Sequence, residues 1–310
     1  MIMRKPRFDR PFRQSDISTY LVCPRMFYFQ EMLSIQQEYR SGAAIMGSAV
    51  HKVIHRIHKG EVKGDLYTDK ALFDALEDEE RADAVPVFWK EGEKDARFEE
   101  ASEILVNYIA KPWNQFAKIL LSEGTFEVNI GRYPFTGTVD QVRVKDDKLI
   151  LVDFKLSDMR PPEEFLRRSY QLSIYSYALA FGKFKDTATG EEVSFGKPPD
   201  EIWLYHLKDH CLYKRTSKYG QAGTEKGPAV YKTSRTMKDL EYLEKDIARI
   251  CGSIRRNIFF RNPSVIGSCN GFCRFQAVCL GEMEQPRITP AQMRAISNLK
   301  EASYAQEAIH

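Results

Sequence analysis

The most informative stretch of this 310-residue chain is residues 150–155, Ile-Leu-Val-Asp-Phe-Lys. The apolar run predicts a buried β-strand, and the strand leads directly into an acid and a base. Because side chains alternate along a strand, Asp153 and Lys155 share one face while Phe154 faces the opposite way. A carboxylate and an ammonium therefore project together from an otherwise apolar strand.

A second predicted strand, Gly137 to Val144, precedes this one and carries Asp140. An Asp-Asp pair at 146–147 supplies the turn, so the Asp140 carboxylate can approach Asp153 and Lys155. Two carboxylates beside one ammonium suit phosphodiester hydrolysis. Carboxylates bind Mg²⁺ or Mn²⁺, the ion lowers the pKa of a bound water, and a lysine can orient or deprotonate that water. A surface hairpin with alternating charge is the competing interpretation; the apolar run and the neighbouring motifs favour the catalytic one.

Two further motifs flank the strand pair. Gln171 and Tyr175 lie one turn apart on a predicted helix, where an amide and a phenol can hold a DNA backbone or base. Amphipathic packing is the other explanation for the tyrosine. Upstream, His51, His55 and His58 fall on one helical side. A solvated, weakly basic face accounts for all three histidines, whereas the functional interpretation makes His51 a neutral metal ligand.

Four of the six cysteines form a one-plus-three pattern. Three lie close together near the end of the chain, Cys269, Cys273 and Cys279. Cys23 lies far upstream, before a proline that predicts a kink. No signal peptide and no apolar run of membrane length are found, so we expect a soluble, cytoplasmic protein, in which clustered cysteines are metal ligands more often than disulfides. Cys211 and Cys251 are isolated, and we interpret them as ordinary thiols.

Composition and charge limit the class of protein only broadly. Hydrophobic residues make up 43% of the chain and aromatic residues 12%, which is enough for a sizeable core and excludes a disordered protein. The formal net charge of +3 is compatible with a nucleic-acid enzyme whose basic groove is balanced by acidic solvent faces. The chain has no GxxxxGK(S/T) phosphate loop, which argues against an ATP-driven motor within it.

The hydrophobic pattern divides the chain into four parts. We expect a mostly helical region at 1–125, the sheet at 126–215, a helix and the three-cysteine segment at 216–285, and a polar tail at 286–310. The predicted helices cover residues 15–35, 47–59, 68–76, 97–121, 161–181 and 236–259, with a charged linker at 77–94. The predicted strands cover residues 126–130, 137–144, 149–155, 201–207 and 211–214.

In this order, the motifs resemble those of the PD-(D/E)XK nucleases of the RecB type. The residues that carry the resemblance are Gly47…His51, Gly137…Asp140, Asp153-Phe-Lys155 and Gln171…Tyr175. The frame of Cys23-Pro-Arg and a terminal three-cysteine cluster resembles the iron–sulfur branch, which includes the nuclease domain of AddB-type recombination proteins and the CRISPR-associated RecB-like exonucleases. The resemblance covers roughly residues 15–283. It implies an α/β fold with a restriction-endonuclease-like central mixed sheet flanked by helices, and a helical iron–sulfur subdomain built from both chain ends.

The resemblance also implies a role for each motif residue. The divalent metal, Mg²⁺ or Mn²⁺, would be bound by His51, Asp140, Asp153 and the backbone carbonyl of Phe154. Lys155 would be the catalytic lysine. Gln171 and Tyr175 would place DNA near the scissile bond, and a 4Fe–4S cluster would be bound by Cys23, Cys269, Cys273 and Cys279. The chain departs from the family pattern in two places: three residues rather than two separate Cys269 from Cys273, and His55 stands where an acidic residue often follows the motif histidine.

Four thiolates suit tetrahedral zinc as well as an iron–sulfur cluster, and the spacing leaves both open. Zinc sites commonly use paired two-cysteine knuckles, and the resemblance favours iron–sulfur. Phe272, Phe275 and Val278 would shield a cluster from solvent. With either metal we expect a structural site, because it ties Cys23 to Cys279 and closes a very long loop.

The leading interpretation is a metal-dependent deoxyribonuclease, an exonuclease acting on single-stranded DNA or DNA ends in repair, recombination or processing. Besides the resemblance, aromatic stretches beside arginines indicate single strands, because bases can stack on the rings while the cations contact phosphates. These residues are Phe27 to Phe29, Tyr170 to Tyr177 and Phe259-Phe260, with Arg167, Arg168, Arg255 and Arg256; core packing is the competing explanation for most of the rings. A non-catalytic nucleic-acid-binding module with a structural metal, and a nuclease directed at RNA, are the alternatives. Any helicase or recombination partner would be a separate protein, and no membrane association is expected.

Overall fold

The computed structural model describes residues 8–35, 39–62, 65–83, 85–110, 117–157, 159–186, 189–210, 230–263, 269, 273 and 275–281. In this part of the chain the main feature is a seven-stranded mixed sheet in the order β7-β6-β3-β4-β5-β8-β9. Its strands are β3 (Lys118–Ile130), β4 (Tyr133–Lys145), β5 (Lys148–Lys155), β6 (Lys183–Lys185), β7 (Glu192–Val193), β8 (Glu201–His206) and β9 (Val230–Thr233). A separate parallel pair joins β1 (Arg40–Ser41) to β2 (Val87–Phe88). The predicted α/β architecture with a central mixed sheet is confirmed.

The strand predicted from residues 150–155 lies inside this sheet. β5 pairs antiparallel with β4 and parallel with β8, so both of its edges are hydrogen-bonded. Both of its faces are covered too: Ile150 and Val152 pack into one core, and Leu151 packs into the other. Burial on both faces explains why the sequence of β5 is continuously apolar rather than alternating.

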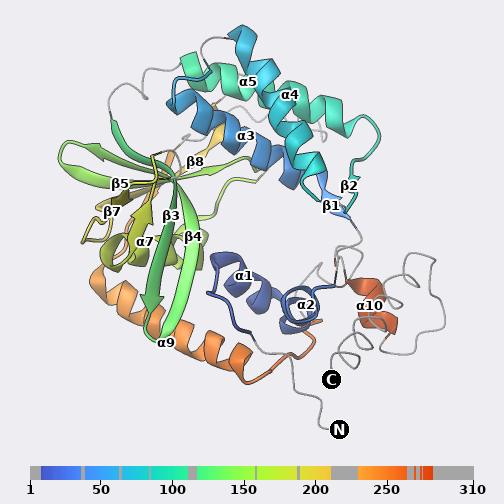
Figure 1. The fold of residues 1–310 in the computed structure, drawn as a ribbon, viewed down its shortest axis with the longest axis vertical. Helices are drawn as coiled ribbons and strands as arrows, with labels where there is room; N and C mark the ends of the chain where they lie inside the picture. Colours follow the sequence, from blue (N-terminus) through green and yellow to red (C-terminus); the bar gives the residue numbers. More distant parts are fainter. Residues whose placement is uncertain are drawn as a thin grey trace.

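Helices lie over both faces of the sheet (Figure 1). The first face is covered by three helices, α3 (Gly42–His58), α4 (Asp65–Arg81) and α5 (Glu93–Ala110). The second face is covered by α7 (Tyr170–Phe181), α9 (Met237–Arg255) and α1 (Gln14–Val22), which contact one another. The short helix α10 (Gln276–Gly281) lies near α2 (Pro24–Phe27), so segments from far apart in the sequence come together there (Figure 1).

The end of the predicted helix at 97–121 is wrong. The predicted helix at 97–121 corresponds to α5, which ends at Ala110, and β3 already begins at Lys118. In β3, Ile119 and Leu121 pair with residues of β4, so tertiary pairing rather than helical spacing decides their conformation.

The bounds of the predicted linker at 77–94 are also wrong. α4 continues to Arg81, and α5 begins at Glu93, so charged residues at both ends of the supposed linker are helical. Lys70–Asp74 and Arg81–Glu77 are ion pairs one helical turn apart on α4, which is how a charged sequence supports an exposed helix face.

Two predicted long helices are each divided. Residues 15–35 form α1, the four-residue α2 and a π-helix, η1 (Tyr28–Met32). The division lies at Cys23, whose extended backbone precedes Pro24, as the proline predicts. Residues 161–181 form α6 (Glu163–Arg168) and α7, divided at Ser169. The Ser169 hydroxyl accepts a hydrogen bond from the Leu172 N–H and so caps α7.

The remaining predicted elements are present in the described residues with shifted ends. The predicted helices at 47–59, 68–76 and 236–259 correspond to α3, α4 and α9, and the strands at 137–144, 149–155 and 201–207 correspond to β4, β5 and β8. The predicted strand at 211–214, Cys211, Phe272 and the tail after 286 lie outside the described residues. The four-part division stays a prediction; its boundary at residue 125 falls within β3. Among the described helices, none combines the length and apolarity needed to cross a membrane.

Candidate functional site

The acidic residues lie where β4 and β5 separate. The backbone pairing of the two strands ends at Gln141 and Val152, and beyond it the Phe154 N–H donates to Oδ2 of Asp140 at 2.6 Å. At this point the acceptor of the hydrogen bond from β5 is a side chain rather than a backbone carbonyl of β4. This hydrogen bond fixes the carboxylate of Asp140 beside β5. Burial alone would raise the pKa of Asp140, but the charge of His51, the hydrogen bond from the Phe154 N–H and the charge of Lys155 lower it.

His51 approaches this carboxylate from α3. Its Nδ1 lies 3.2 Å from Oδ1 of Asp140. Burial would lower the pKa of the imidazole, but the negative charge of Asp140 overrides it and raises the pKa to about 9. Without a metal, His51 is therefore a cation at neutral pH. The neutral form required of a metal ligand needs this proton to leave.

Asp153 and Lys155 form an ion pair at the end of β5. The Lys155 Nζ lies 2.9 Å from Oδ2 of Asp153. Burial raises the pKa of Asp153 to about 6, although the positive charge of Lys155 opposes this. Burial would lower the pKa of Lys155, but the charges of Asp153 and Asp140 raise it. The lysine is therefore held as an ammonium beside two acids, as its place on the strand predicts.

Gln171 connects this pair to α7. Its Nε2 donates to Oδ1 of Asp153 at 2.9 Å and to the Tyr175 hydroxyl oxygen at 3.2 Å, while its Oε1 accepts from Lys155 Nζ at 3.4 Å. Burial raises the pKa of Tyr175, so the phenol stays protonated. Arg235 holds the start of α7 by donating to the Ser173 hydroxyl at 2.7 Å. The structure thus brings the predicted Gln171 and Tyr175 to the predicted acids.

Glu123 is a site residue that sequence reasoning missed. It lies on β3 between Ser122 and Gly124, which pair with residues 141 and 139 of β4, so it stands opposite Asp140. Its backbone is left-handed, with φ of 52°, at an irregular part of the strand. Burial, and then the charge of Asp140, raise the pKa of Glu123 to about 7. The register of the hairpin was the signal that could have identified it. Ile130 pairs with Tyr133, so the residue seven positions before Ile130, Glu123, lies opposite the residue seven positions after Tyr133, Asp140.

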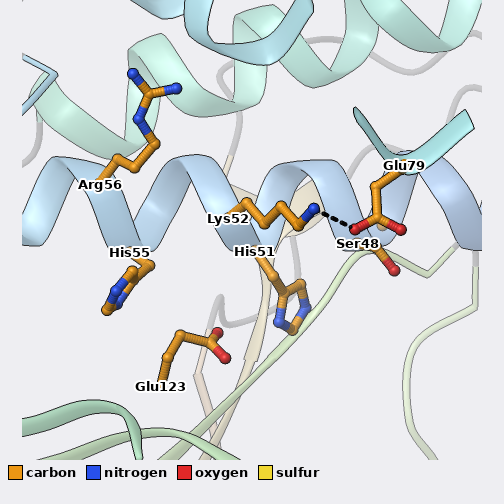
Figure 2. Close-up of a pocket in the computed structure, with 8 residues that line it drawn as sticks. Ser48, His51, Lys52, His55, Arg56, Glu79 and Glu123 are labelled. Carbon is orange, nitrogen blue, oxygen red and sulfur yellow. Dashed lines mark ion pairs between the residues drawn. The ribbon is translucent and has the colours of Figure 1, made fainter. Parts of the chain in front are cut away.

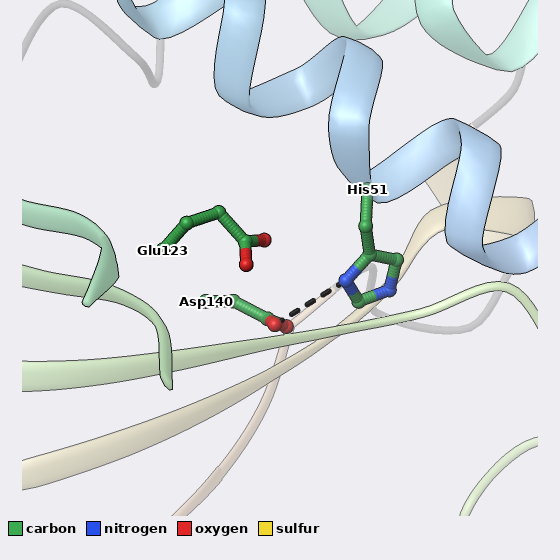
Figure 3. Close-up of side chains that lie close together, drawn as sticks. All are labelled: His51, Glu123 and Asp140. Atoms are coloured by element: carbon green, nitrogen blue, oxygen red, sulfur yellow. Dashed lines mark hydrogen bonds and ion pairs between the residues drawn. The ribbon is translucent and has the colours of Figure 1, made fainter. Parts of the chain in front are cut away.

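His51, Glu123 and Asp140 form a group able to hold a metal ion (Figure 3). Each offers one ligand atom, and the three atoms lie within 4.8 Å of one another. The imidazole points toward the two carboxylates from α3, and the carboxylates project from neighbouring strands (Figure 3). Imidazole and carboxylate donors suit Mn²⁺, and carboxylates suit Mg²⁺, so these residues fit the predicted ion. In the family pattern an acidic residue often follows the motif histidine, and in this chain His55 stands at that position of α3. Glu123 instead supplies an acid near His51 from β3.

The other two histidines of α3 have different partners. The His55 Nδ1 lies 2.9 Å from the Ser122 hydroxyl. The His58 Nε2 lies 2.6 Å from the Tyr108 hydroxyl, and burial lowers the pKa of His58 to about 3. Among the three, the structure therefore places His51 with the acids, in agreement with the sequence argument.

The four predicted cluster cysteines gather at the α2–α10 end of the molecule. Cys23 lies at the break between α1 and α2, and Cys279 lies on α10. Burial raises the pKa of the Cys273 thiol, and the nearby thiols of Cys23, Cys269 and Cys279 raise it further. Cys251 lies on α9 and is buried in the hydrophobic core, apart from these four, as expected of an ordinary thiol.

Apolar residues surround this thiol group. Phe29, Ile35, Phe275 and Val278 form a small buried cluster against which Cys273 and Cys279 pack. A backbone hydrogen bond joins an early and a late segment of the chain there, because the Arg25 N–H donates to the Phe260 carbonyl at 3.1 Å. A thiolate set with apolar cover fits a bound metal or cluster, because it excludes water from the site.

Most of the rings predicted to stack on bases are in the core. Phe27 and Phe29 are fully buried, and Tyr175 and Tyr177 are buried as well. Phe260 remains exposed, at 58%. Core packing therefore explains the majority of these aromatic residues, and contact with a single strand stays a prediction.

Comparison with known proteins identifies the family. A family model described as the PD-(D/E)XK nuclease superfamily matches residues 11–280. The chain belongs to this superfamily. As a PD-(D/E)XK nuclease it is a metal-dependent enzyme that cleaves nucleic acid. Asp140 lies on β4, and Asp153 and Lys155 lie on β5. No curated protein sequence matches the chain.

Two solved structures are similar to this PD-(D/E)XK nuclease. One, from Eubacterium rectale, is named as an exonuclease; the identity is 12% and the TM-score 0.45, over 86% of this chain and 88% of that chain. The other, of SSO0001, has 12% identity and a TM-score of 0.33, over 79% of this chain and 87% of that chain.

Binding of a divalent ion is expected to release a proton from His51. Its pKa of about 9 means that the ion competes with a proton at neutral pH. Apparent Mn²⁺ affinity should therefore rise about tenfold per pH unit between about pH 7 and pH 9, and level off above. Calorimetric titration in two buffers of different ionisation enthalpy measures the released proton directly.

His51→Gln should remove this proton release near pH 8, and His55→Gln, one turn along α3, should retain it. Equal proton release by wild type and His51→Gln would contradict the assignment of the raised pKa to His51.

Proposed function

We propose that this nuclease is a deoxyribonuclease, an exonuclease that acts on single-stranded DNA or DNA ends in DNA repair, recombination or processing in the cytoplasm. The observation that carries the proposal is the convergence of His51, Asp140, Asp153 and Lys155 at one end of β5, with a histidine–acid distance of 3.2 Å and a lysine–acid distance of 2.9 Å. Acids alone would suit many metal sites. The ammonium beside them is the feature that suits a phosphate substrate.

In the proposed site, Mg²⁺ or Mn²⁺ would be held by His51, Asp140, Asp153 and the Phe154 carbonyl, and Glu123 would add a further carboxylate. The bound ion would supply a positive charge for the scissile phosphate and lower the pKa of a water. Asp140 orients this set, because one of its oxygens accepts the Phe154 N–H while the other faces His51.

Lys155 is the proposed catalytic residue. Its side chain is one-third exposed, so it can reach the phosphate or the attacking water while Asp153 and Gln171 hold it in place. Gln171 binds Asp153, Lys155 and Tyr175 at once, so we assign it a positioning role in addition to its proposed contact with DNA. Tyr175 remains a phenol and can donate to a DNA phosphate or base.

For the cysteine site we propose a 4Fe–4S cluster bound by Cys23, Cys269, Cys273 and Cys279, with zinc as the lesser alternative. The one-plus-three division and the apolar cover support this assignment. The proposed role is structural, because the site joins α2 to the segment before and within α10. Any helicase or recombination partner is proposed to be a separate protein.

Cleavage of end-labelled DNA tests the proposed function. Single-stranded, blunt duplex and circular DNA, and a matching RNA strand, are incubated with Mg²⁺ or Mn²⁺. We expect metal-dependent release of short products from linear single strands or ends, and at least tenfold slower cleavage of circular DNA and of RNA. Preferential cleavage of RNA, or equal cleavage of circles, would contradict the substrate or the exonuclease mode. Cleavage of neither nucleic acid would contradict the assignment to a deoxyribonuclease.

A further inference from the structure

A pocket of about 490 Å³ adjoins the metal-binding group along α3 (Figure 2). It shares His51 and Glu123 with that group and extends past Lys52, His55 and Arg56. The pocket is open to solvent on one side, and its volume falls in the range of small-ligand sites. A strand whose scissile phosphate lies at the metal group therefore has an adjoining space to enter.

Two parallel rows of side chains on α3 border this space. His51 and His55 are four residues apart and project toward Glu123 (Figure 2). Ser48, Lys52 and Arg56 form the second row, also at intervals of four residues. Residues four apart are separated by about 6 Å along a helix. This interval along the helix axis is comparable to the spacing of consecutive phosphates in an extended strand. The two cationic heads point apart in Figure 2, Lys52 toward Glu79 and Arg56 away from Glu123, so both long side chains turn toward the strand when phosphates replace their carboxylate partners.

Lys52 and Arg56 are available to a phosphate although each has a carboxylate partner. Lys52 Nζ lies 2.7 Å from Glu79, and Arg56 Nε lies 3.5 Å from Glu61. The lysine is 49% exposed and the arginine 38% exposed, and ion pairs at such positions are weak because water competes for both partners. A phosphate in the pocket can therefore replace the carboxylates, and the paired acids keep the free site near neutrality.

We propose that Lys52 and Arg56 form a two-phosphate subsite, which holds two consecutive phosphates of the DNA strand beside the scissile one. The proposal rests on the proposed deoxyribonuclease function and names the part of the protein that holds the rest of the strand. The Lys52 ammonium binds one phosphate as a point charge, and the Arg56 guanidinium binds the next. The two residues therefore contribute to DNA binding and leave the bond-breaking step to the groups around Lys155.

Phosphate-specific interference tests the subsite. Short single strands are made with one uncharged methylphosphonate at each backbone position in turn, and their Kd values are measured with Ca²⁺ under conditions without detectable cleavage. Wild type is expected to bind about tenfold more weakly when either of two adjacent positions is neutral. Lys52→Gln should abolish this penalty at one of the two positions, and Arg56→Gln should abolish it at the other. The double variant should reduce the slope of log Kd against log salt concentration by about 2.

Lys70→Gln and Arg249→Gln are the matched controls. Each removes one exposed cation from a helix, and each original side chain has an acidic partner, Asp74 or Asp246, as Lys52 and Arg56 do. Neither control residue lines the pocket. Both controls are expected to keep the wild-type interference pattern, and a control that erased the same positions would overturn the proposal.

Parallel cleavage assays with Mn²⁺ separate the subsite from the proposed function. Lys52→Gln and Arg56→Gln should raise KM about tenfold and change kcat less than threefold. If wild type cleaves DNA but the variants retain both penalties, the subsite is wrong and the nuclease function stands. If wild type does not cleave DNA but the variants abolish the two penalties, the subsite stands and the proposed function fails. If wild type does not bind the strands, both are wrong.

Discussion

Lys155→Ala should lower the kcat of DNA cleavage about 10³-fold while the protein remains folded. The Lys155 ammonium lies 2.9 Å from Asp153, and a third of the side chain is exposed. Truncation of this side chain therefore removes little buried packing. Alanine removes both the charge that faces the phosphate and the donor to Gln171. The expected loss therefore falls on the chemical step rather than on stability.

The substitution also acts on Asp153. Lys155 opposes the effect of burial on this acid, so without the lysine the pKa of Asp153 should rise above its present value of about 6. Metal binding then weakens at neutral pH, because a proton competes more strongly for the carboxylate. Rates should be compared at saturating Mn²⁺ near pH 8, where this effect is small.

Lys148→Ala is the matched control for Lys155→Ala. Lys148 lies at the other end of β5, is exposed, and pairs with Glu201 away from the acids. This control should cleave DNA at the wild-type rate. Wild-type kcat in Lys155→Ala, under conditions where the metal site is saturated, would remove Lys155 from the mechanism.

Cys269→Ala should release the iron of the proposed cluster and lower the melting temperature by about 5–10 °C. Cys269 is exposed, so truncation of its side chain removes no buried packing. A large loss of stability would therefore come from the loss of the proposed cluster, which would join Cys23 to cysteines more than two hundred residues away. Iron and sulfide analysis, together with thermal unfolding, measures both effects on the same sample.

Cys251→Ala is the control for Cys269→Ala, because it should lose some stability without losing iron. Cys251 is fully buried on α9, so this variant should lose about 1–2 kcal/mol of stability through a small cavity while it keeps its iron. Cys269→Ala protein with wild-type melting and DNA binding would contradict a structural role. Stoichiometric zinc in place of iron in the wild-type protein would contradict the cluster assignment.

The sequence predicted the fold because β5 combines two signals in a few residues. Its continuous apolar run indicates a strand buried on both faces, and the acid and lysine at its end mark the motif. The start of β3 was harder to predict, because Ile119 and Leu121 fit a helical pattern and only their pairing with β4 makes them part of a strand. Propensity is local, whereas this pairing depends on a partner more than twenty residues away.

The candidate site was predicted for the residues that lie in short motifs. Asp140, His51 and Gln171 were proposed from their places in the motifs together with the family resemblance, and the structure brings each to Asp153 or to its neighbours. Glu123 was missed because a single acid before a glycine resembles a turn, and its left-handed backbone gives no periodic signal. Extending the β3–β4 register from the Gly131 turn would have placed it opposite Asp140.

The contact between residues near 20 and residues near 260 has a consequence for synthesis. The Tyr20 hydroxyl donates to the Ile258 carbonyl at 2.7 Å, and the Asn262 side chain donates to the Val22 carbonyl at 3.1 Å. At about 5–20 residues per second, a ribosome takes roughly 10–50 s to make the 238 residues between the first two partners. The nascent α1 segment, with Ile17 and Tyr20 on its apolar side, can contact β4 and α7 earlier, but it must wait that long for α9 and the residues after it. Maturation of the protein, and any loading of its cysteines, therefore follows the completion of translation past α9 rather than accompanying it.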